Sequence, residues 1–355
     1  MEKKVLVAMS GGVDSSVCAV LLQRQGFLCS GAMLQLNPLP TNEGGCCSLD
    51  DAEDARAAAH RLGMRFYVFN ERERFAREVM DRFVAEYCAG RTPNPCIDCN
   101  RCLKFGALLD RALMLGYDYV ATGHYARVAY DAQLGRYHLL RGVDAHKDQS
   151  YVLYQLTQAQ LAHLLLPVGE YRKSEIRAIA QHAGLRNADK SDSQDICFVP
   201  DRDYVRFLRE YGRVDSPPGN FVDGSGRVLG RHRGLVCYTT GQRKGLGVSA
   251  DRPLYVIAKD ASDNTVLLGD DKDLFCSALL ASRVNWIEPE PAGALRVSAK
   301  TRYSQTECGA TVTPLPDGMV RVDFDAPQRA ITAGQAVVFY DGERVYGGAT
   351  IERAL

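Results

Sequence analysis

The most constraining feature of the sequence is the stretch 5–22, which reads VLVAMSGGVDSSVCAVLL. It combines an apolar strand, a glycine-bearing loop and the start of an apolar helix in one short segment. Gly11 and Gly12 allow backbone turns that are closed to residues with a Cβ atom. Hydroxyl and carboxylate side chains flank these glycines where they and the helix-start N–H groups can meet phosphate oxygens: Ser10, Asp14, Ser15 and Ser16. The stretch therefore predicts an anion-binding loop.

Other phosphate-binding loops fit this chain less well. A Walker A loop needs GxxxxGK followed by Ser or Thr, a dinucleotide fold needs GxGxxG, and neither string occurs. The string SGGVDSS instead resembles the pyrophosphate-binding loop of the ATP pyrophosphatases, which adenylate a substrate oxygen and expel pyrophosphate. An ordinary strand-to-helix turn, with glycine at positive φ and Ser or Asp as the N-cap, is the structural alternative.

Length and composition describe an ordinary globular protein. A chain of 355 residues is expected to hold two or three domains, and its 46% hydrophobic and 24% charged residues argue against extensive disorder. No run of 18 apolar residues occurs, and glycines interrupt the first apolar run too early for a secretory signal, so we expect a cytoplasmic protein. Because the formal net charge is zero, any polyanion site must come from a local basic patch.

Strand and helix patterns alternate through the first part of the chain. The expected elements after the loop helix are strand 27–36, a loop at 37–47, a helix from Asp50 to Gly63, strand RFYVF, helix 74–89, the loop PNPCIDCNRC, helix LKFGALLDRALMLG and strand YDYVATG. This alternation is typical of an α/β, doubly wound parallel sheet, whose ligands bind at the carboxyl ends of the strands. A hairpin at 130–140 and helices at 158–164 and 173–183 complete a first domain, 1–202.

The second half of the chain has a different texture. A helix at 203–211 precedes a Gly/Pro-rich stretch, and the region 224–250 holds five Lys or Arg residues and one His without an acid. This basic run is a candidate polyanion surface, and a solvated face is the alternative. Beyond Leu254, short alternating runs that begin with LYVIA and TVLLG predict antiparallel strands closing into a small barrel. We expect a small central domain over 203–275 and a C-terminal antiparallel β-barrel over 276–355.

Two cysteine segments form a second candidate site. Twelve cysteines in an intracellular chain favour reactive or ligating thiols and buried structural ones over a disulfide framework. The segment 92–105 reads TPNPCIDCNRCLKF, in which a thiol before a helix start, near Arg101 and Lys104, is expected to have a lowered pKa. The segment 191–198 reads SDSQDICF. Cys99 and Cys197 are 98 positions apart, and the sequence alone does not show that they are adjacent.

At these residues the resemblance to a known family becomes close. The chain resembles the bacterial tRNA-specific 2-thiouridylase family (MnmA), of the N-type ATP pyrophosphatase superfamily. The matching strings, in order, are AMSGGVDSS, GAML, CCSLDDAEDAR, TPNPCIDCN with KFG, ATGHYAR, KDQSYVLY, GEYRKSEIR, SDSQDICF, TTGQRKGLG and RYSQ. The resemblance implies a nucleotide-binding α/β domain, a small central domain and a C-terminal β-barrel, of which the last two help to hold a tRNA.

The resemblance also implies a reaction. ATP, with Mg2+, would adenylate O2 of the wobble uridine at position 34 of a tRNA anticodon, pyrophosphate would leave, and a persulfide sulfur would attack C2 and displace AMP. Cys197 would carry the persulfide and Cys99 would act with it, so that closing a disulfide between them releases the sulfur. Asp14 would serve phosphate and metal. A sulfur-donor protein, such as a cysteine desulfurase or a sulfur relay protein, would supply the sulfur.

Carried over residue by residue, the resemblance names three groups of site residues. The ATP-binding positions are Ala8, Met9, Ser10, Gly11, Gly12, Val13, Asp14 and Ser15, with Leu34 and Gly123 near the adenine and ribose. The positions near the target base of the anticodon stem-loop are Asn94, Pro95 and Cys96. The other tRNA-contacting positions are His124, Lys147, Asp148, Gln149, Arg302, Tyr303 and Gln335. A turn cap is the alternative for His124.

One position departs from the family. Most members have an acidic residue after PNP, where this chain has Cys96, so the carboxylate thought to assist proton transfer is missing. Asp98 is a substitute whose direction the sequence does not give. The change creates CxxCxxC at Cys96, Cys99 and Cys102, a spacing that can hold zinc or an iron–sulfur cluster. The second hypothesis for the sulfur chemistry is therefore a [4Fe-4S] cluster held by Cys96, Cys99 and Cys197.

The remaining cysteines and two other functions complete the alternatives. Cysteines in apolar or strand contexts are expected to be buried small hydrophobes: Cys18, Cys29, Cys88, Cys237, Cys276 and Cys308. For Cys46 and Cys47 two alternatives stay open: they lie near the active site, or they have a structural role. The chain can also be read as an ATP pyrophosphatase that adenylates a small metabolite, or as a non-catalytic RNA-binding protein. The paired cysteine segments argue against the first, and the intact phosphate loop argues against the second.

Overall fold

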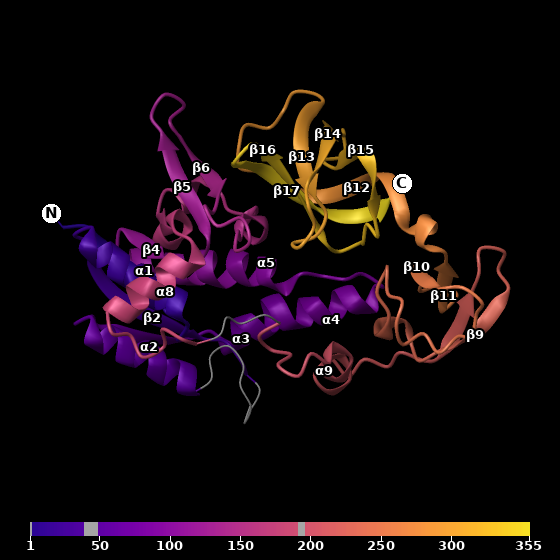
Figure 1. Ribbon diagram of the computed structural model, residues 1–355, viewed down its shortest axis with the longest axis horizontal. Coiled ribbons are helices and arrows are strands. Elements are labelled where there is room, and N and C mark those ends of the chain that lie inside the picture. The colour runs from indigo at the N-terminus through magenta and orange to yellow at the C-terminus, as the bar shows by residue number, and fades with distance from the viewer. Residues whose placement is uncertain (1, 39–48, 191–195) are drawn as a thin grey trace.

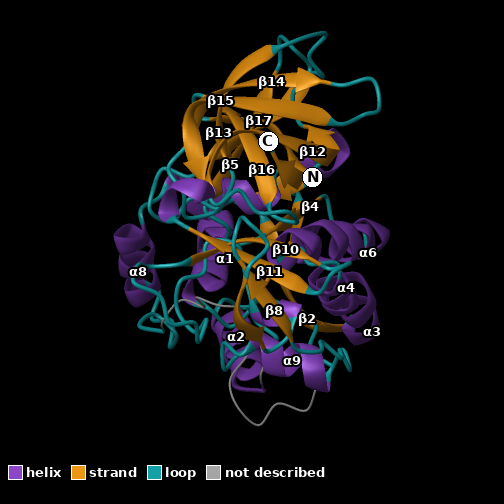
Figure 2. Ribbon diagram, turned by 90° about the vertical axis from the view of Figure 1, so that its right-hand side faces the viewer, coloured by secondary structure: helices purple, strands orange, loops and turns teal. Residues whose placement is uncertain are grey.

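The computed structural model describes residues 2–38, 49–190 and 196–355. Three sheets follow one another along the chain: a parallel sheet covered by helices, a small four-stranded sheet and a β-barrel (Figure 1). The barrel lies above the helix-covered part in the side view (Figure 2). The predicted fold class is therefore confirmed. Cys46, Cys47 and the polar run 191–195 lie outside the described residues, and no helix within the described ranges is long and apolar enough to cross a membrane.

The first part is built on five parallel strands in the order β3-β2-β1-β4-β7. Their bounds are β1 (Lys4–Ala8), β2 (Leu28–Gln35), β3 (Phe66–Asn70), β4 (Tyr119–Ala121) and β7 (Leu164–Leu165). Because side chains alternate along a strand, Val5 and Val7 pack into one apolar cluster and Leu6 into another on the opposite face. Burial on both faces explains why β1 reads as a continuous apolar run.

Helices cover both faces of this sheet. The layer that packs on Val5 and Val7 contains α1 (Val13–Arg24), α2 (Leu49–Arg61) and α8 (Lys173–His182). The layer that packs on Leu6 contains α3 (Arg72–Phe75), α4 (Asp81–Cys88), α5 (Pro95–Cys99) and α6 (Leu108–Met114). The π-helical stretches η1 (Ala76–Met80) and η2 (Asn100–Ala107) join α3 to α4 and α5 to α6. Each pair thus forms one continuous helical run.

Short elements connect the first part to the rest of the chain. They are the hairpin β5 (Ala126–Asp131) and β6 (Arg136–Arg141), the helix α7 (Gln158–Leu161), and the 3-10 turns η3 (Ser150–Leu153) and η4 (Pro167–Glu170). The hairpin was expected at this place, but it does not stay with the parallel sheet. Leu140 of β6 pairs with Arg344 of the barrel, so the hairpin extends the barrel's sheet.

The small sheet follows α9 (Tyr204–Glu210) and has the strand order β10-β11-β8-β9. Its strands are β8 (Gly219–Val222), β9 (Val228–His232), β10 (Tyr255–Asp260) and β11 (Thr265–Gly269), with the 3-10 turn η5 (Leu235–Cys237) between β9 and β10. The runs LYVIA and TVLLG therefore belong to this sheet, and their assignment to the barrel was wrong. Alternating polarity identifies a half-buried strand but does not say which sheet it joins.

The barrel has six antiparallel strands, preceded by the 3-10 turn η6 (Asp271–Leu274). They are β12 (Phe275–Trp286), β13 (Leu295–Lys300), β14 (Cys308–Pro314), β15 (Val320–Arg329), β16 (Ala336–Asp341) and β17 (Arg344–Ala354). The order β12-β15-β14-β13-β16-β17 is closed by pairing of β12 with β17, so the barrel has no free strand edge of its own. Inward-facing alternate residues such as Val320 and Val322 fill its interior.

Candidate active site

The loop after β1 has the geometry of an anion-binding helix start. Gly11 has φ +78°, and a Cβ atom there would collide with the backbone carbonyl of Asp51 at the start of α2. Gly12 is the N-cap of α1 and makes no side-chain cap bond. The first N–H groups of a twelve-residue helix therefore lack the cap that a Ser or Asp at that position would supply. The Ser15 hydroxyl accepts from Ser10 N at 3.2 Å and fixes the loop from inside.

Asp14, in the first turn of α1, is held by two residues from distant parts of the chain. Lys173 Nζ at the start of α8 lies 2.7 and 2.9 Å from its two carboxylate oxygens. The Tyr125 hydroxyl donates to Asp14 Oδ1 at 2.8 Å. The Lys173 side chain is 11% exposed and that of Asp14 is 25% exposed, so the pair sits at the mouth of the loop, partly shielded from water. Negative charge at the helix start is thus balanced before any phosphate arrives.

Gly123 and Leu34 lie on either side of this loop. A Cβ atom on Gly123 would be 2.7 Å from Asp14 C and from Ser15 N, so the segment after β4 touches the start of α1 backbone to backbone. Leu34 is buried near the end of β2 and pairs with Phe69 of β3. Both residues therefore stand at the carboxyl edge of the sheet, where the ATP-binding residues were predicted. Their contacts with adenine and ribose stay predictions.

The segment PNPCIDCNRC was expected to be a loop, but its residues from Pro95 on form the helix α5 and the helical stretch η2. Asn94 is the N-cap of α5 and accepts from Cys96 N at 3.2 Å, and Pro95 occupies the first turn, where its missing N–H is harmless. Cys96 is exposed, whereas Cys99, one turn later, is buried. Cys102 is also buried, and burial raises its pKa, so it is not the activated thiol that the neighbouring basic residues predicted.

Asp98 does not replace the missing acid. It lies two residues after the exposed Cys96, about 200° around the helix, and its side chain is buried. The Arg82 guanidinium lies 2.9 Å from Asp98 Oδ1, and Arg101 lies 3.4 Å from the same oxygen. Burial raises the pKa of Asp98 while these arginines oppose the rise. The carboxylate therefore serves an internal ion pair and points away from the side on which Cys96 is exposed.

The two cysteine segments meet in one apolar cluster. Cys99 belongs to the core on the Leu6 face of the sheet, and Cys197 packs against that same core. The next residue, Phe198, fixes the second segment: its ring contacts Phe83 at 5.3 Å and Phe207 at 5.0 Å between centroids. Ala8, the last residue of β1, packs against the same cluster. The two cysteine segments and the strand that enters the phosphate loop thus contribute to one extended apolar cluster on the Leu6 face of the sheet.

No disulfide joins the cysteines of the described ranges, so the Cys99–Cys197 bond, expected as a step of the reaction, stays a prediction. Within the described chain, no group of three or more His, Cys, Asp or Glu side chains is arranged to hold a metal ion, so Cys96, Cys99 and Cys197 do not form a cluster site. Cys96, Cys99 and Cys102 also lie on one continuous helical run and span about 9 Å along its axis. This spacing is too extended for the three thiols to surround one ion.

Three of the six cysteines that were expected to be buried small hydrophobes are fully buried. Cys18, Cys29 and Cys237 are buried, and Cys276 and Cys308 are half-buried. Cys88 is exposed, because it is the last residue of α4 and lies where the helix ends in solvent. The prediction that it is buried was wrong.

Tyr303, expected at the tRNA, lies between β13 and β14 of the barrel and faces the first part. Its ring lies 6.1 Å from that of Tyr151. Burial, and then the charges of Asp148 and Cys96, raise the pKa of Tyr303. Tyr303 is 42% exposed, so an aromatic side chain of the barrel is open to solvent at this contact.

Several predicted tRNA contacts have internal roles in the structure. Asp148 accepts from Gly142 N at 3.0 Å and from the Ser150 hydroxyl at 2.9 Å. Gln149 Oε1 accepts from the backbone N–H of Tyr125. The hydroxyl of the same tyrosine donates to Asp14. Neighbouring Lys147 is half-buried, and its N–H donates to Asp144 O. His124 is buried and hydrogen-bonded to Thr122 Oγ1 at 2.7 Å, and burial lowers its pKa well below the usual range. A neutral, interior His124 fits the turn-cap alternative.

Gln335 and Arg302 connect the barrel to the other two parts. Gln335 Nε2 donates to Thr92 O at 2.8 Å, and Thr92 N donates to Ala333 O at 2.9 Å, so the barrel grips the chain just before α5. Arg302 donates to Thr332 Oγ1 at 2.7 Å within the barrel and to Thr240 O at 3.2 Å in the central part. Burial lowers its pKa.

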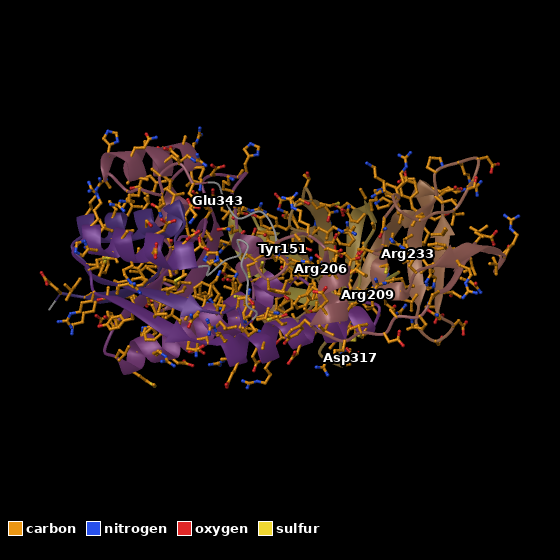
Figure 3. All side chains as sticks on the ribbon, turned by 90° about the horizontal axis from the view of Figure 1, so that it is seen from below. Tyr151, Arg206, Arg209, Arg233, Asp317 and Glu343 are labelled. Carbon is orange, nitrogen blue, oxygen red and sulfur yellow. The ribbon has the colours of Figure 1, made fainter. Side chains whose placement is uncertain are left out.

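The basic run of the central part surrounds an exposed loop. Arg243 and Lys244 are exposed at its tip, and the loop is supported from inside by Lys259 Nζ, which donates to Tyr238 O at 3.0 Å. Figure 3 shows Arg206 and Arg209 of α9 in the same region of the molecule as Arg233, between the helix-covered part and the small sheet. The exposed bases Arg243 and Lys244 of the basic run therefore lie on the central part, whereas Arg206 is ion-paired with Asp201.

Sequence reasoning missed several residues of the phosphate loop. Lys173 and Tyr125 lie within GEYRKSEIR and ATGHYAR, so their strings were noticed without a role for either side chain. Asn187 donates to Gly11 O and to Ser16 Oγ, both at 3.0 Å, and Lys190 Nζ lies 2.8 Å from Asp51 Oδ1. No local motif identifies Asn187 and Lys190, because their hydrogen-bond partners are more than 130 positions away in the sequence.

Three family models match successive parts of this chain. Residues 3–201 match the tRNA methyl transferase HUP domain, residues 205–270 the tRNA methyl transferase PRC-barrel domain, and residues 276–351 the aminomethyltransferase beta-barrel domain. The tRNA-specific 2-thiouridylase MnmA of Moorella thermoacetica is 53% identical over 352 residues, which cover 98% of this chain and 99% of the relative. That of Acetivibrio thermocellus is 50% identical over 360 residues and 99% of each chain.

Solved structures are more distant. The U34-tRNA thiolase NcsA from Methanococcus maripaludis with its [4Fe-4S] cluster has 18% identity and a TM-score of 0.35, covering 70% of this chain and 76% of that one, a likeness too low to carry an argument. The full-length relatives suffice: the chain belongs to the tRNA-specific 2-thiouridylase MnmA family.

Proposed function

We propose that this protein is a tRNA-uridine 2-sulfurtransferase, which uses ATP to convert the wobble uridine of a tRNA anticodon to 2-thiouridine. One observation carries the proposal beyond family membership. The cysteine segments at 99 and 197 pack in one cluster with Ala8, the residue that leads into the phosphate loop. An adenylating loop and a pair of thiols in one site suit a reaction that activates an oxygen and replaces it with sulfur.

In the first half-reaction, the phosphate loop binds ATP and uridine O2 attacks the α-phosphate. The uncapped N–H groups at the start of α1 and the Ser10 hydroxyl would donate to phosphate oxygens, while the Ser15 hydroxyl donates to Gly12 O and supports the loop. Lys173 holds Asp14 in place until the nucleotide binds. Carboxylate and hydroxyl oxygens are ligands that Mg2+ prefers, so Asp14 fits a Mg2+ that neutralises the pyrophosphate leaving group.

In the second half-reaction, sulfur moves from Cys197 to C2. The terminal sulfur of a Cys197 persulfide attacks C2 and AMP leaves, which joins the base to Cys197 through two sulfurs. The Cys99 thiolate then attacks Cys197 Sγ, 2-thiouridine is released, and a Cys99–Cys197 disulfide forms that an external thiol must reduce. The reduced thiols begin the cycle, and a sulfur-donor protein restores the persulfide.

The cluster hypothesis is the second candidate for the sulfur source. The described thiols do not fit it, as they converge on no common metal position, so no step is derived through it. Iron and sulfide analysis of anaerobically purified protein tests it directly. Iron-free protein that still thiolates tRNA, and that keeps its activity as Cys96→Ala, eliminates the cluster.

The tRNA would lie across all three parts of the molecule. The anticodon loop would approach the start of α5 at the half-buried Asn94 and the exposed Cys96, whereas Pro95 is buried and would support them from within. The anticodon stem would run toward the basic loop of the central part. Since both substrates and the reduced thiols belong to the cytoplasm, the reaction would take place there.

The proposal is tested with unmodified tRNA, ATP and sulfide or a cysteine desulfurase. Pyrophosphate release and mass analysis of the tRNA nucleosides should both be positive for the wild-type protein. Cys197→Ser and Cys99→Ser should keep ATP- and tRNA-dependent pyrophosphate release and lose 2-thiouridine with the desulfurase. Pyrophosphate release with a small metabolite and without tRNA would instead support the small-molecule adenylating function, and tRNA binding without either product would support the RNA-binding one.

A further inference from the structure

The chain that enters α5 is held between the first part of the molecule and the barrel. Arg91 lies three residues before Asn94, the N-cap of α5. Its Nε lies 2.6 Å from Glu86 Oε2 near the end of α4, and its Nη1 lies 2.5 Å from Glu352 Oε2 on β17. Its Nη2 also donates to the Ile351 carbonyl at 3.3 Å. One guanidinium therefore joins the two parts directly before the cysteine-bearing helix.

The contacts around Arg91 close into a ring. Glu86 also accepts from Arg283 Nη2 at 3.3 Å, and Glu352 also accepts from the Ser282 hydroxyl. Because Ser282 and Arg283 are neighbours on β12, the ring runs from α4 through Arg91 to β17 and returns through β12. The side chains of Arg91, Glu86 and Glu352 are 19%, 15% and 30% exposed, so water and salt screen the ring only in part.

The backbone that follows Arg91 is held as closely. Besides its two hydrogen bonds with the barrel, Thr92 lies against Gly334, where a Cβ atom would be 2.9 Å from Thr92 N. Pro93 and Pro95 fix φ on both sides of Asn94. The anchored residues are therefore joined to α5 by a stiff connection, every residue of which the structure describes.

The helix itself lies between the same two parts. Ile97 belongs to the apolar cluster that contains Ala336 and Tyr340 of β16, whereas Cys99 belongs to the cluster on the Leu6 face of the parallel sheet. The place of Cys99 therefore depends on how the barrel seats α5, and the ring around Arg91 fixes that seating at the start of the helix.

We propose that Arg91 is a positioning residue, which fixes α5 between the barrel and the first part so that the Cys99 thiol is held where sulfur transfer occurs. Attack of the Cys99 thiolate on Cys197 Sγ needs the reacting sulfurs in line, so a shift of α5 by about 1 Å would slow this step strongly. The partners of Arg91 are not residues of the phosphate loop, so adenylation should be spared. This inference rests on the proposed function, since it assigns a role within the same sulfur transfer.

The test compares Arg91→Met, which removes the charge and keeps a long side chain, with Arg91→Lys, which keeps the charge. Arg91→Met should lower kcat for 2-thiouridine formation about tenfold, while KM for ATP and the rate of pyrophosphate release stay within about twofold of wild type. Arg91→Lys should recover most of the lost rate. Arg127→Met, which removes the ion pair of the hairpin with Glu343 of the barrel, is the matched control and should leave kcat unchanged.

A second variant tests the same contact from the barrel side. Glu352→Gln removes the charge that Arg91 meets on β17, and it should lower kcat for 2-thiouridine formation several-fold. Because both residues act through one contact, the double variant Arg91→Met/Glu352→Gln should be no slower than Arg91→Met alone.

A further readout does not depend on thiolation. Amide hydrogen exchange of the peptide 94–105, measured by mass spectrometry, should be several-fold faster in Arg91→Met than in wild type, whereas exchange of α1 should not change. If the wild-type protein makes no 2-thiouridine, the proposed function fails, and exchange still decides whether Arg91 fixes α5.

Three results would overturn the positioning role. In the first, Arg91→Met forms 2-thiouridine at the wild-type kcat. In the second, it lowers adenylation and thiolation equally, together with the melting temperature, as a purely structural residue would. In the third, hydrogen exchange of α5 stays at the wild-type rate.

Discussion

The phosphate loop and the sulfur-transfer side of the site are built in different ways. The loop is a contiguous stretch in which strand, turn and helix start follow one another, and its glycines are required where backbone approaches backbone. The sulfur and tRNA side gathers α5 from the first part, Tyr303 and Gln335 from the barrel, and a basic loop from the central part. One contiguous motif encodes the first kind of site, whereas a site whose residues come from several domains depends on the contacts between those domains.

Many contacts join the barrel to the first part, among them the ion pair of Arg91 with Glu352 and the hydrogen bond from Asn285 to Tyr154 O. Gln335 and the Ala333 carbonyl hold Thr92 from both sides, and Arg302 bridges the barrel and the central part. The comparison therefore predicts that substitutions in the loop lower ATP-dependent adenylation alone. Substitutions in the contacts between the parts should lower tRNA binding or sulfur transfer and leave adenylation unchanged.

The largest effect is expected at the loop itself. Asp14→Ala should reduce pyrophosphate release by about a thousandfold or more, because it removes the carboxylate that Lys173 and Tyr125 hold at the phosphate site. The dissociation constant for tRNA, measured by filter binding, should stay within a few-fold of wild type. Equal loss of ATP-dependent activity and tRNA affinity would break the division between the two regions.

A backbone contact in the same region gives the next effect. Gly123→Ala introduces a Cβ atom 2.7 Å from Asp14 C and Ser15 N, and the start of α1 must shift to admit it. A displacement of this size should lower kcat/KM for ATP by about a hundredfold. Gly224→Ala, where no atom lies within 4 Å of the new methyl group, is the control and should behave as wild type. Normal kinetics in Gly123→Ala would mean that the loop tolerates movement.

These two regions also differ in how far the sequence predicted them. The loop and the doubly wound sheet could be predicted because glycine, apolar periodicity and helix starts are local signals. The cysteine pair was identified only through its resemblance to a family, since the cluster that unites Cys99 and Cys197 depends on Phe198 and its neighbours. Lys173 and Lys190 were missed because an ion pair between residues far apart leaves no pattern in a single chain.

A stability measurement probes the support of the basic loop. Burial lowers the pKa of Lys259 from 10.5 to about 8. The unfolded chain holds this proton to higher pH, so the folded state is penalised below about pH 8 and the penalty fades as the pH approaches 10.5.

Lys259→Met should therefore stabilise the protein at pH 7 by roughly 2 kcal/mol, since relief of about 3 kcal/mol is offset by the lost hydrogen bond to Tyr238 O. Urea unfolding at pH 7 and at pH 9.5 measures the difference, which should shrink at the higher pH. A difference that does not depend on pH would show that burial of charge is not the cause.

The smallest effect separates direct tRNA contact from domain positioning. Arg243 and Lys244 are exposed, so replacing both with Ala should weaken tRNA binding about tenfold and reduce the slope of log affinity against log salt by about one unit per lost phosphate contact. Arg302 is largely buried and donates to Thr240 O and Thr332 Oγ1, so Arg302→Ala should weaken tRNA binding with little change in slope. Salt titrations of tRNA affinity for the three proteins distinguish the two roles. An unchanged slope in the double variant would make the basic loop a solvated face, and a slope lowered by one unit in Arg302→Ala would make Arg302 a phosphate ligand.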